Sequence, residues 1–227
     1  MSNSPAARAD ENFLRKHTEV VIAILLGLVS VATAYSSFQA ALYDGKVIEA
    51  NTQATTLATE AESLYLEGNQ QYVQDAQLFD RLTDLRLDIE NPDAAISAAA
   101  QIKYDTIYSQ SVSDEFDLAI RKADEVNLSD SPRWFSPLDD DDYQAYLFGG
   151  YADTKDEADA VLAQAQEFGA LGDRLTLTTV LLALSLFLLG ISAVVRNFTV
   201  RLILGGVAVA IFVGALVMVA FVPFVGL

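Results

Sequence analysis

Three long apolar runs divide the chain into segments of opposite character. Val20 to Tyr43, Leu175 to Val195 and Leu202 to Leu227 each hold at least 21 consecutive residues without a charged side chain. A helix rises about 1.5 Å per residue and a bilayer's hydrocarbon core is about 30 Å thick, so about 20 apolar residues suffice to cross it. The pattern therefore predicts three transmembrane helices, at residues 20–43, 175–195 and 202–227.

The first run has a second interpretation. Ala32-Thr33-Ala34 fits the small-x-small pattern of a signal-peptide cleavage site after an apolar stretch. The uncharged, helix-forming sequence continues beyond this site through Phe38 and Leu42, which favours an uncleaved signal anchor. Under either interpretation, the residues that follow lie on the same side of the membrane.

Residues 44–174 have the pattern of helices. Ala, Leu, Glu and Gln are frequent in this region, and it holds only three prolines. An apolar seam with alternating spacings of four and three residues continues straight out of the first membrane helix; its members are Ala50, Ala54, Leu57, Ala61 and Leu64. We therefore expect an all-α integral membrane protein with three transmembrane helices and an antiparallel, coiled-coil-like helical ectodomain.

Proline and glycine mark the expected helix boundaries in this region. Asn91-Pro92-Asp93 supplies an N-cap, a proline at the first helical position and an acid in the first turn, so the next helix is expected from about Pro92 to Val126. Residues 129–142 hold two prolines, several serines and a run of acids, which predicts a loop.

After the loop, a short helix is expected from about Asp142 to Phe148, with Gly149-Gly150 stopping it. The last outer helix is expected to begin near Asp153 and to continue into the second membrane segment. Gly68 leaves open whether the first outer helix forms one long stalk or breaks into a compact bundle, because a glycine costs a helix only about 1 kcal/mol.

Charge assigns the orientation. The net charge is −17, and residues 44–174 alone hold 28 Asp and Glu against 9 Lys and Arg. Arg8, Arg15 and Lys16 precede the first run, while Arg196 and Arg201 flank the turn between the last two. Because Lys and Arg near membrane helices are retained in the cytoplasm, we expect a cytoplasmic N-terminal tail (1–19), a cytoplasmic turn (196–201) and an extracytoplasmic acidic domain (44–174) in a multi-pass cell-membrane protein.

Short motifs resemble a known group of proteins. They are YSSFQAALYDG at 35–45, Asp75 and Phe79, PLDDDDYQAYLF at 137–148, and the closing pair of apolar runs. The chain resembles an uncharacterised prokaryotic family of three-helix membrane proteins with a helical insert, and the resemblance implies that architecture but no activity. The excess of Asp over Glu and of Arg over Lys further resembles proteins of halophilic archaea, whose acidic surfaces are screened by salt.

Residues that could carry chemistry are few. The chain has no cysteine, and its single histidine, His17, lies in the N-terminal tail, so no Cys/His metal centre is expected. The run Asp139 to Asp142, with Asp130 nearby, is the best candidate for a calcium-type site, but acids at a helix N-terminus are more often a solvated cap. We expect no catalytic residue, no metal, no cofactor and, given the acidic exterior, no nucleic-acid partner.

Small residues and one glycosylation motif are the remaining candidates. Small-xxx-small ridges, which let membrane helices approach closely, occur at Ala23 and Gly27 and at Gly206, Ala210 and Gly214. They could pack within one chain or between chains, and packing within the chain is slightly favoured. Asn127-Leu-Ser129 is a candidate N-glycosylation site on the outer side, whereas Asn197-Phe-Thr199 lies in the expected cytoplasmic turn.

These features favour a non-enzymatic membrane protein that serves as an envelope scaffold or interaction subunit. Its expected partners are membrane lipid and either further copies of itself or another membrane protein. The alternative is an oligomeric channel or transporter subunit in which polar residues of the second membrane segment line a pore; these residues are Thr176, Thr178, Thr179 and Ser185. Signalling is disfavoured because the expected cytoplasmic parts are only a short tail and a turn.

Overall fold

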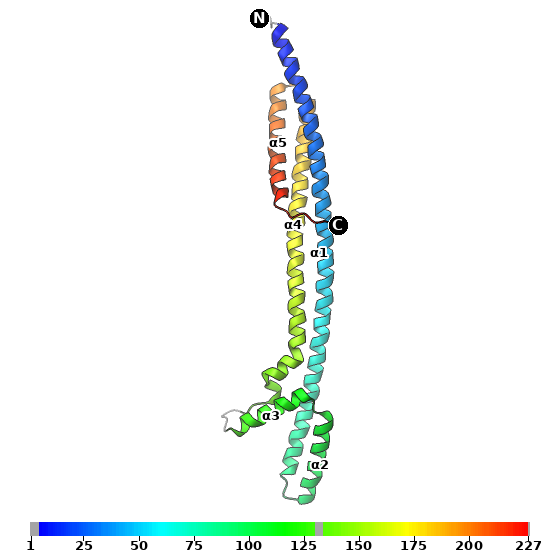
Figure 1. Cartoon of the computed structure of the whole chain (residues 1–227), viewed down its shortest axis with the longest axis vertical. Coiled ribbons are helices and arrows are strands. Elements are labelled where there is room, and N and C mark those ends of the chain that lie inside the picture. The colour runs from blue at the N-terminus through cyan, green and yellow to red at the C-terminus, as the bar shows by residue number, and fades with distance from the viewer. Residues whose placement is uncertain (1–4, 130–133, 227) are drawn as a thin grey trace. The chain divides into compact units, whose positions relative to one another are not determined.

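The computed structural model describes residues 5–129 and 134–226, with side chains from Thr18 onward. All regular structure in this part of the chain is helical (Figure 1): α1 (Pro5–Ile89), α2 (Ala94–Ser111), α3 (Asp114–Leu128), the 3-10 helix η1 (Pro137–Asp139), α4 (Asp141–Val194) and α5 (Phe198–Ala220). Helices α1, α4 and α5 each contain a stretch long and apolar enough to cross a membrane. The predicted all-α class with three such helices is confirmed.

The chain forms two compact units. The first, here called the membrane unit, comprises residues 1–52 and 161–227 and contains the three apolar stretches. The second, here called the insert unit, comprises residues 53–160. Helices α1 and α4 contribute to both units, so each unit is described by itself.

Helices α1, α4 and α5 lie side by side in the membrane unit (Figure 1). Their shared core consists of Val29, Leu182, Leu189, Ala208 and Ala215. Many large apolar side chains of the same helices remain exposed on the outside of this unit, among them Val31, Phe187 and Val207. An apolar exterior around an apolar core suits helices surrounded by lipid, since lipid tails solvate apolar side chains as well as a protein interior does.

The insert unit has an aromatic-rich core. Phe116, Ala119, Ile120, Tyr143 and Leu147 form its buried centre, drawn from α3 and the first turns of α4. Tyr72 and Phe79 of α1 pack against this centre, together with Tyr108 of α2. The core therefore holds the four helices of the unit together.

Helix ends in the insert unit differ from the expected ones. The predicted single helix from Pro92 to Val126 is wrong, because Val112 and Ser113 separate α2 from α3 and the Ser113 hydroxyl accepts a hydrogen bond from the Phe116 amide at 3.2 Å. The N-cap of α2 is Asp93, not Asn91, and its carboxylate accepts the Ala95 amide at 2.9 Å.

Glycine does not interrupt either long helix. The stop predicted at Gly149-Gly150 is wrong, since α4 runs through both residues. Helix α1 likewise continues through Gly68, where the absence of a side chain serves a close contact: a Cβ at this position would lie 2.4 Å from the carbonyl oxygen of Leu147. At Gly68 close packing against α4 outweighs the intrinsic cost of glycine, whereas Gly149 has no such neighbour and the helix tolerates the cost of about 1 kcal/mol.

The third apolar helix is shorter than expected. It ends at Ala220 and not at Leu227, and Phe221 to Gly226 are not helical. Pro223 explains the end, because proline lacks a backbone N–H and disfavours helical geometry in the residue before it. Helix α1 passes through Ala32-Thr33-Ala34 without a break, and the uncleaved anchor stays a prediction.

Candidate functional site

A buried tyrosine–aspartate pair joins α1 to α4 in the insert unit. The Tyr143 hydroxyl donates a 2.6 Å hydrogen bond to the Asp75 carboxylate, and the Gln71 side-chain amide donates to the same oxygen at 2.9 Å. Asp75 and Tyr143 are each only 2% exposed. Burial and the hydrogen bond to Asp75 raise the pKa of Tyr143, so its phenol stays protonated and remains a donor at neutral pH.

Asp140 caps α4 and binds α3. One carboxylate oxygen accepts the amides of Asp142 and Tyr143, both at 3.1 Å, and the other lies 2.5 Å from the Lys122 ammonium. Burial raises the pKa of Asp140, but the Lys122 ammonium and the two amides outweigh burial and hold the pKa below its ordinary value. The expected cap is therefore present, but Asp140 is buried and not solvated.

A charged brace links three helices at the far end of the same unit. The Arg86 guanidinium of α1 binds both carboxylate oxygens of Asp124 in α3, at 3.0 and 3.1 Å. It also donates to the Tyr104 hydroxyl of α2 at 3.2 Å and lies over that ring. The planar guanidinium suits this geometry, because its fork of N–H donors matches a carboxylate in two places.

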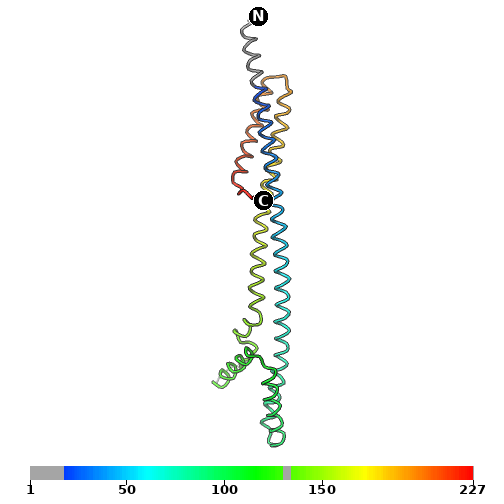
Figure 2. Tube along the Cα trace, turned by 45° about the vertical axis from the view of Figure 1, so that its right-hand side comes forward, coloured from blue at the N-terminus to red at the C-terminus, as the bar shows by residue number. Residues whose placement is uncertain are grey.

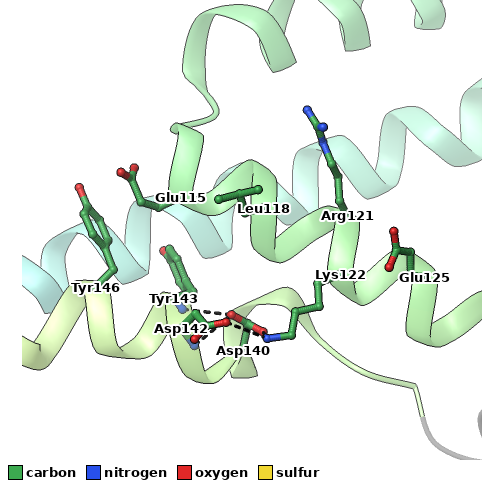
Figure 3. A pocket seen from close by; sticks show the side chains of 9 residues that line it. All are labelled: Glu115, Leu118, Arg121, Lys122, Glu125, Asp140, Asp142, Tyr143 and Tyr146. Atoms are coloured by element: carbon green, nitrogen blue, oxygen red, sulfur yellow. Dashed lines mark hydrogen bonds and ion pairs between the residues drawn. The ribbon is translucent and has the colours of Figure 1, made fainter.

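An open cleft of about 500 Å³ lies between α3 and the first turns of α4 (Figure 3). Its lining carries four acids, two bases, two tyrosines and a leucine, namely Glu115, Leu118, Arg121, Lys122, Glu125, Asp140, Asp142, Tyr143 and Tyr146. Both bases also have carboxylate partners within the chain, Arg121 with Asp117 at 2.5 Å and Lys122 with Asp140.

The pKa shifts in this cleft indicate ion pairs that stay charged at neutral pH. The pKa of Lys122 is raised by its bonds to Asp140 and Asp142, while the pKa of Asp140 is lowered, so both shifts lead away from neutral pH. General acid–base catalysis works best with a pKa near the operating pH. The arrangement can therefore hold helices and present charge, but these groups are not tuned for proton transfer. Among the described side chains, no group of three or more His, Asp or Glu could hold a metal ion.

The buried Arg201 joins the three helices of the membrane unit near the turn between α4 and α5. Arg201 of α5 donates to the carbonyl oxygens of Ser192 and Ala193, at 3.1 and 3.0 Å, at the last turn of α4. Its guanidinium also binds the Glu19 carboxylate of α1 at 3.3 Å. Carbonyls in the last turn of a helix have no partner within the helix, so Arg201 caps α4 and ties it to both neighbours.

The residues after α5 return to α1, as Figure 2 shows. The Gln39 side chain pairs with the backbone of Val225 through two hydrogen bonds of 3.0 and 3.1 Å, and the Tyr43 hydroxyl donates to the Pro223 carbonyl at 2.8 Å. An apolar cluster that includes Ala40 and Leu175 packs under the tail. These bonds satisfy tail backbone groups that have no helical partner.

The hydroxyls proposed to line a pore are engaged inside the membrane unit. Thr178 and Thr179 donate to carbonyls one turn earlier in α4, and Ser185 donates to the Ala208 carbonyl of α5 at 2.9 Å. Thr178 and Ser185 are buried, whereas Thr176 is exposed. Ser185 thus joins α4 to α5 within one chain, whereas the Thr178 hydroxyl bonds within α4.

The predicted small-residue ridges face outward. Ala23, Gly27, Gly206, Ala210 and Gly214 are all exposed, and a Cβ built on any of the three glycines would have no atom within 4 Å. The favoured expectation, packing within the chain, therefore differs from the structure. The helices of one chain meet through other faces, which carry the membrane-unit core described above, and ridge packing between chains stays a prediction.

The two glycosylation motifs hold structural asparagines. The half-buried Asn127 side chain pairs with the Phe135 backbone, donating to its carbonyl at 2.9 Å and accepting its amide at 2.7 Å. Asn197 is the N-cap of α5 and accepts the Thr199 amide at 3.1 Å. His17 and Asp130, named from the sequence, lie outside the side chains that the structure describes.

Sequence reasoning missed the three ties Asp75–Tyr143, Arg86–Asp124 and Glu19–Arg201. Each joins residues from different helices, and no spacing rule connects them. One signal was present, because Asp75 and Arg201 are charged residues in otherwise apolar patterns.

Comparison with known proteins gives no relative. No family model, no curated protein and no solved structure matches the chain. The resemblance to the uncharacterised membrane-protein family stays a prediction, and the function proposed below is inferred from the residues described above.

Proposed function

We propose that the chain is a non-enzymatic integral membrane protein of the cell envelope that displays residues 44–174 outside the cytoplasm as a scaffold or interaction subunit. One observation carries this proposal: the buried carboxylates of the insert unit, Asp75 and Asp140, are bound to side chains of other helices. These bonds hold the helices of the insert unit in one arrangement, so the outer surface of the unit keeps one shape. A helical surface of constant shape, anchored by three membrane helices, suits a protein that binds other proteins.

Within this proposal, α1 and α4 pack in the insert unit as an antiparallel coiled coil. Support comes from α1, where buried positions recur every seven residues, at Ala54, Ala61, Gly68, Asp75 and Leu82. Seven-residue spacing keeps one seam of a helix facing its partner. The contact of Gly68 with the Leu147 backbone and of Leu64 with Gly150 fits two helices that run in opposite directions.

The expected partners are membrane lipid and a second copy of the chain or another membrane protein. The outward-facing ridges support this expectation, because small residues exposed on membrane helices permit close approach of another helix. A pore is less well supported, since Thr178 and Ser185 are bonded within one chain. We expect proteoliposomes that contain the purified protein to show no ion flux above that of empty vesicles.

Co-purification from native membranes tests the proposed function. Two copies with different tags are produced in the same cells, the membranes are crosslinked, and one tag is purified. We expect the second tag, or another membrane protein, in crosslinked bands. Mixing membranes from cells that make only one tagged copy controls for association after lysis. A crosslinked sample that contains only monomer would contradict the proposal.

A further inference from the structure

The charges of α3 are arranged symmetrically about one exposed leucine. Leu118 is 66% exposed although it lies in the second turn of a helix whose other face forms the core of the unit. Its neighbours on the same helix face are the residues three and four positions away, which are Asp114 and Glu115 on one side and Arg121 and Lys122 on the other. Acids therefore precede the leucine at the same distances at which bases follow it.

This order makes the face complementary to itself. When two identical helices pack antiparallel about a two-fold axis, a residue three positions before the axis meets the residue three positions after it on the other copy. With Leu118 on the axis, Glu115 of each copy meets Arg121 of the other. Asp114 lies opposite Lys122, whose ammonium is already bound to Asp140 and Asp142 of its own chain, so the Glu115–Arg121 pair carries the complementarity. A parallel arrangement would instead place like charges together.

We propose that the Leu118 face of α3 is a contact between two copies of this chain, related by a two-fold axis that passes beside Leu118. This inference rests on the proposed function, of which it names the surface. The two leucines meet at the axis, and an ion pair between Glu115 and Arg121 forms on each side of it.

The shape of the insert unit fits this contact. The 500 Å³ cleft beside Leu118 has Tyr146 on its other wall, and Tyr146 is itself 57% exposed (Figure 3). The cleft gives the partner's leucine an apolar side chain to pack against. Helix α3 also runs across, and not along, the part of α1 within the same unit (Figure 1), and Asp114, Leu118 and Arg121 on the proposed face are exposed.

Membrane anchoring compensates for the small size of this contact. Stable dimers of free proteins bury about 1,200 to 2,000 Å², more than two short helices provide. Anchoring in one bilayer raises the effective concentration of the second copy, as a linker does for two tethered modules. The contact is therefore expected in membranes and is weak in dilute detergent.

One ion pair within the chain competes with the proposed contact for Arg121, and removing that pair gives a control variant. Arg121 already binds Asp117 at 2.5 Å, one turn earlier on α3. An Asp117→Asn variant removes that pair and leaves the charges that face the second copy unchanged. It is therefore expected to associate at least as well as the natural chain.

Thiol crosslinking in membranes tests the contact, because the chain has no cysteine and one substitution supplies its only thiol. We expect Leu118→Cys to form dimers with an oxidant or a short bis-maleimide. Leu87→Cys, on α1 of the same unit and 65% exposed, is the control and is expected to remain monomeric. Equal crosslinking at both positions, or none at Leu118→Cys, would overturn the proposed contact.

Reversing the charges of Glu115 and Arg121 distinguishes this contact from other modes of association. In the Leu118→Cys background, Glu115→Arg or Arg121→Glu alone should lower association by about tenfold, since each places like charges together twice. Both substitutions in one chain should restore dimers, and so should producing the two single variants together in the same cells. Fluorescence of Trp134, the only tryptophan, checks that each variant is folded.

The outcomes distinguish the two proposals. Loss on single reversal with recovery in the double variant supports the contact. Equal crosslinking of all the charge variants would show that the surface is wrong, while co-purification of tagged copies would still support self-association. Absence of any association in native membranes would overturn both.

Discussion

Asp75 is a carboxylate in the middle of the buried face of α1, where its neighbours in the seven-residue pattern are Gly68 and Leu82. A buried carboxylate is costly unless hydrogen bonds satisfy it, and here Tyr143 and Gln71 donate to it. The sequence singled out Asp75 only among the motifs of the family resemblance and could not supply its donor, because Tyr143 lies 68 residues away.

Removing the phenol should destabilise the insert unit more than removing the charge. Tyr143→Phe leaves Asp75 with one donor fewer, and we expect a loss of about 1–3 kcal/mol in the free energy of unfolding. Asp75→Asn keeps an acceptor for the Tyr143 hydroxyl and should cost less. Denaturant unfolding followed by Trp134 fluorescence measures both, and equal stability of Tyr143→Phe and the natural chain would contradict the role of this bond.

The same bond predicts a dependence on alkaline pH. The pKa of Tyr143 is raised in the folded chain above its unfolded value of about 10. The resulting stabilisation is complete below that unfolded value and is lost as pH rises above it, toward the folded pKa. Stability measured from pH 8 to 11 should therefore fall more steeply for the natural chain than for Tyr143→Phe. Parallel curves for the two proteins would refute this assignment.

Variants of the Asn127 motif separate the structural role of this side chain from its role as a glycan acceptor. Asn127→Ala removes both bonds to Phe135 and the glycan acceptor, whereas Ser129→Ala removes the acceptor motif and the Ser129 bond to the Val126 carbonyl but keeps both bonds to Phe135. We expect faster proteolysis between α3 and η1 in Asn127→Ala than in Ser129→Ala. Mass spectrometry of the native protein should find any N-glycan on Asn127 and none on Asn197.

The helices themselves were largely predictable, because length and apolar content decide which segments can cross a membrane. Their ends were less so. Ser113 and Asp93 begin helices through side-chain hydrogen bonds that several nearby polar residues could equally have made. Gly149-Gly150 was expected to end a helix, but α4 continues because glycine only weakens a helix and packing elsewhere holds it.

Two glycines on the long helices are expected to respond in opposite ways. Gly68→Ala places a Cβ 2.4 Å from the Leu147 carbonyl oxygen, and we expect a loss of about 1–3 kcal/mol as the helices move apart. Gly149→Ala meets no atom within 4 Å and should raise stability by up to about 1 kcal/mol. Thermal unfolding followed by circular dichroism compares them; a Gly68→Ala variant as stable as Gly149→Ala would contradict the close packing of α1 on α4.

At the scale of the whole molecule, the distribution of charge along the chain determines the proposed orientation in the membrane. The acids are concentrated in residues 44–174, and the bases outside that region are in the N-terminal tail, the turn before α5 and the first turn of α5. The structure changes the role of one of these bases, because Arg201 is buried against Glu19 and the α4 carbonyls. Arg196, which is exposed, remains available as an orientation signal in that turn.

The most direct test of the central claim is the side of the membrane on which residues 44–174 lie. Because the chain has no cysteine, Leu128→Cys, 86% exposed in the insert unit, and Phe198→Cys, at the first residue of α5, each supply a single thiol. A membrane-impermeant maleimide applied to intact cells should label Leu128→Cys and should label Phe198→Cys only after lysis. Labelling of Phe198→Cys in intact cells, with Leu128→Cys protected until lysis, would contradict the account.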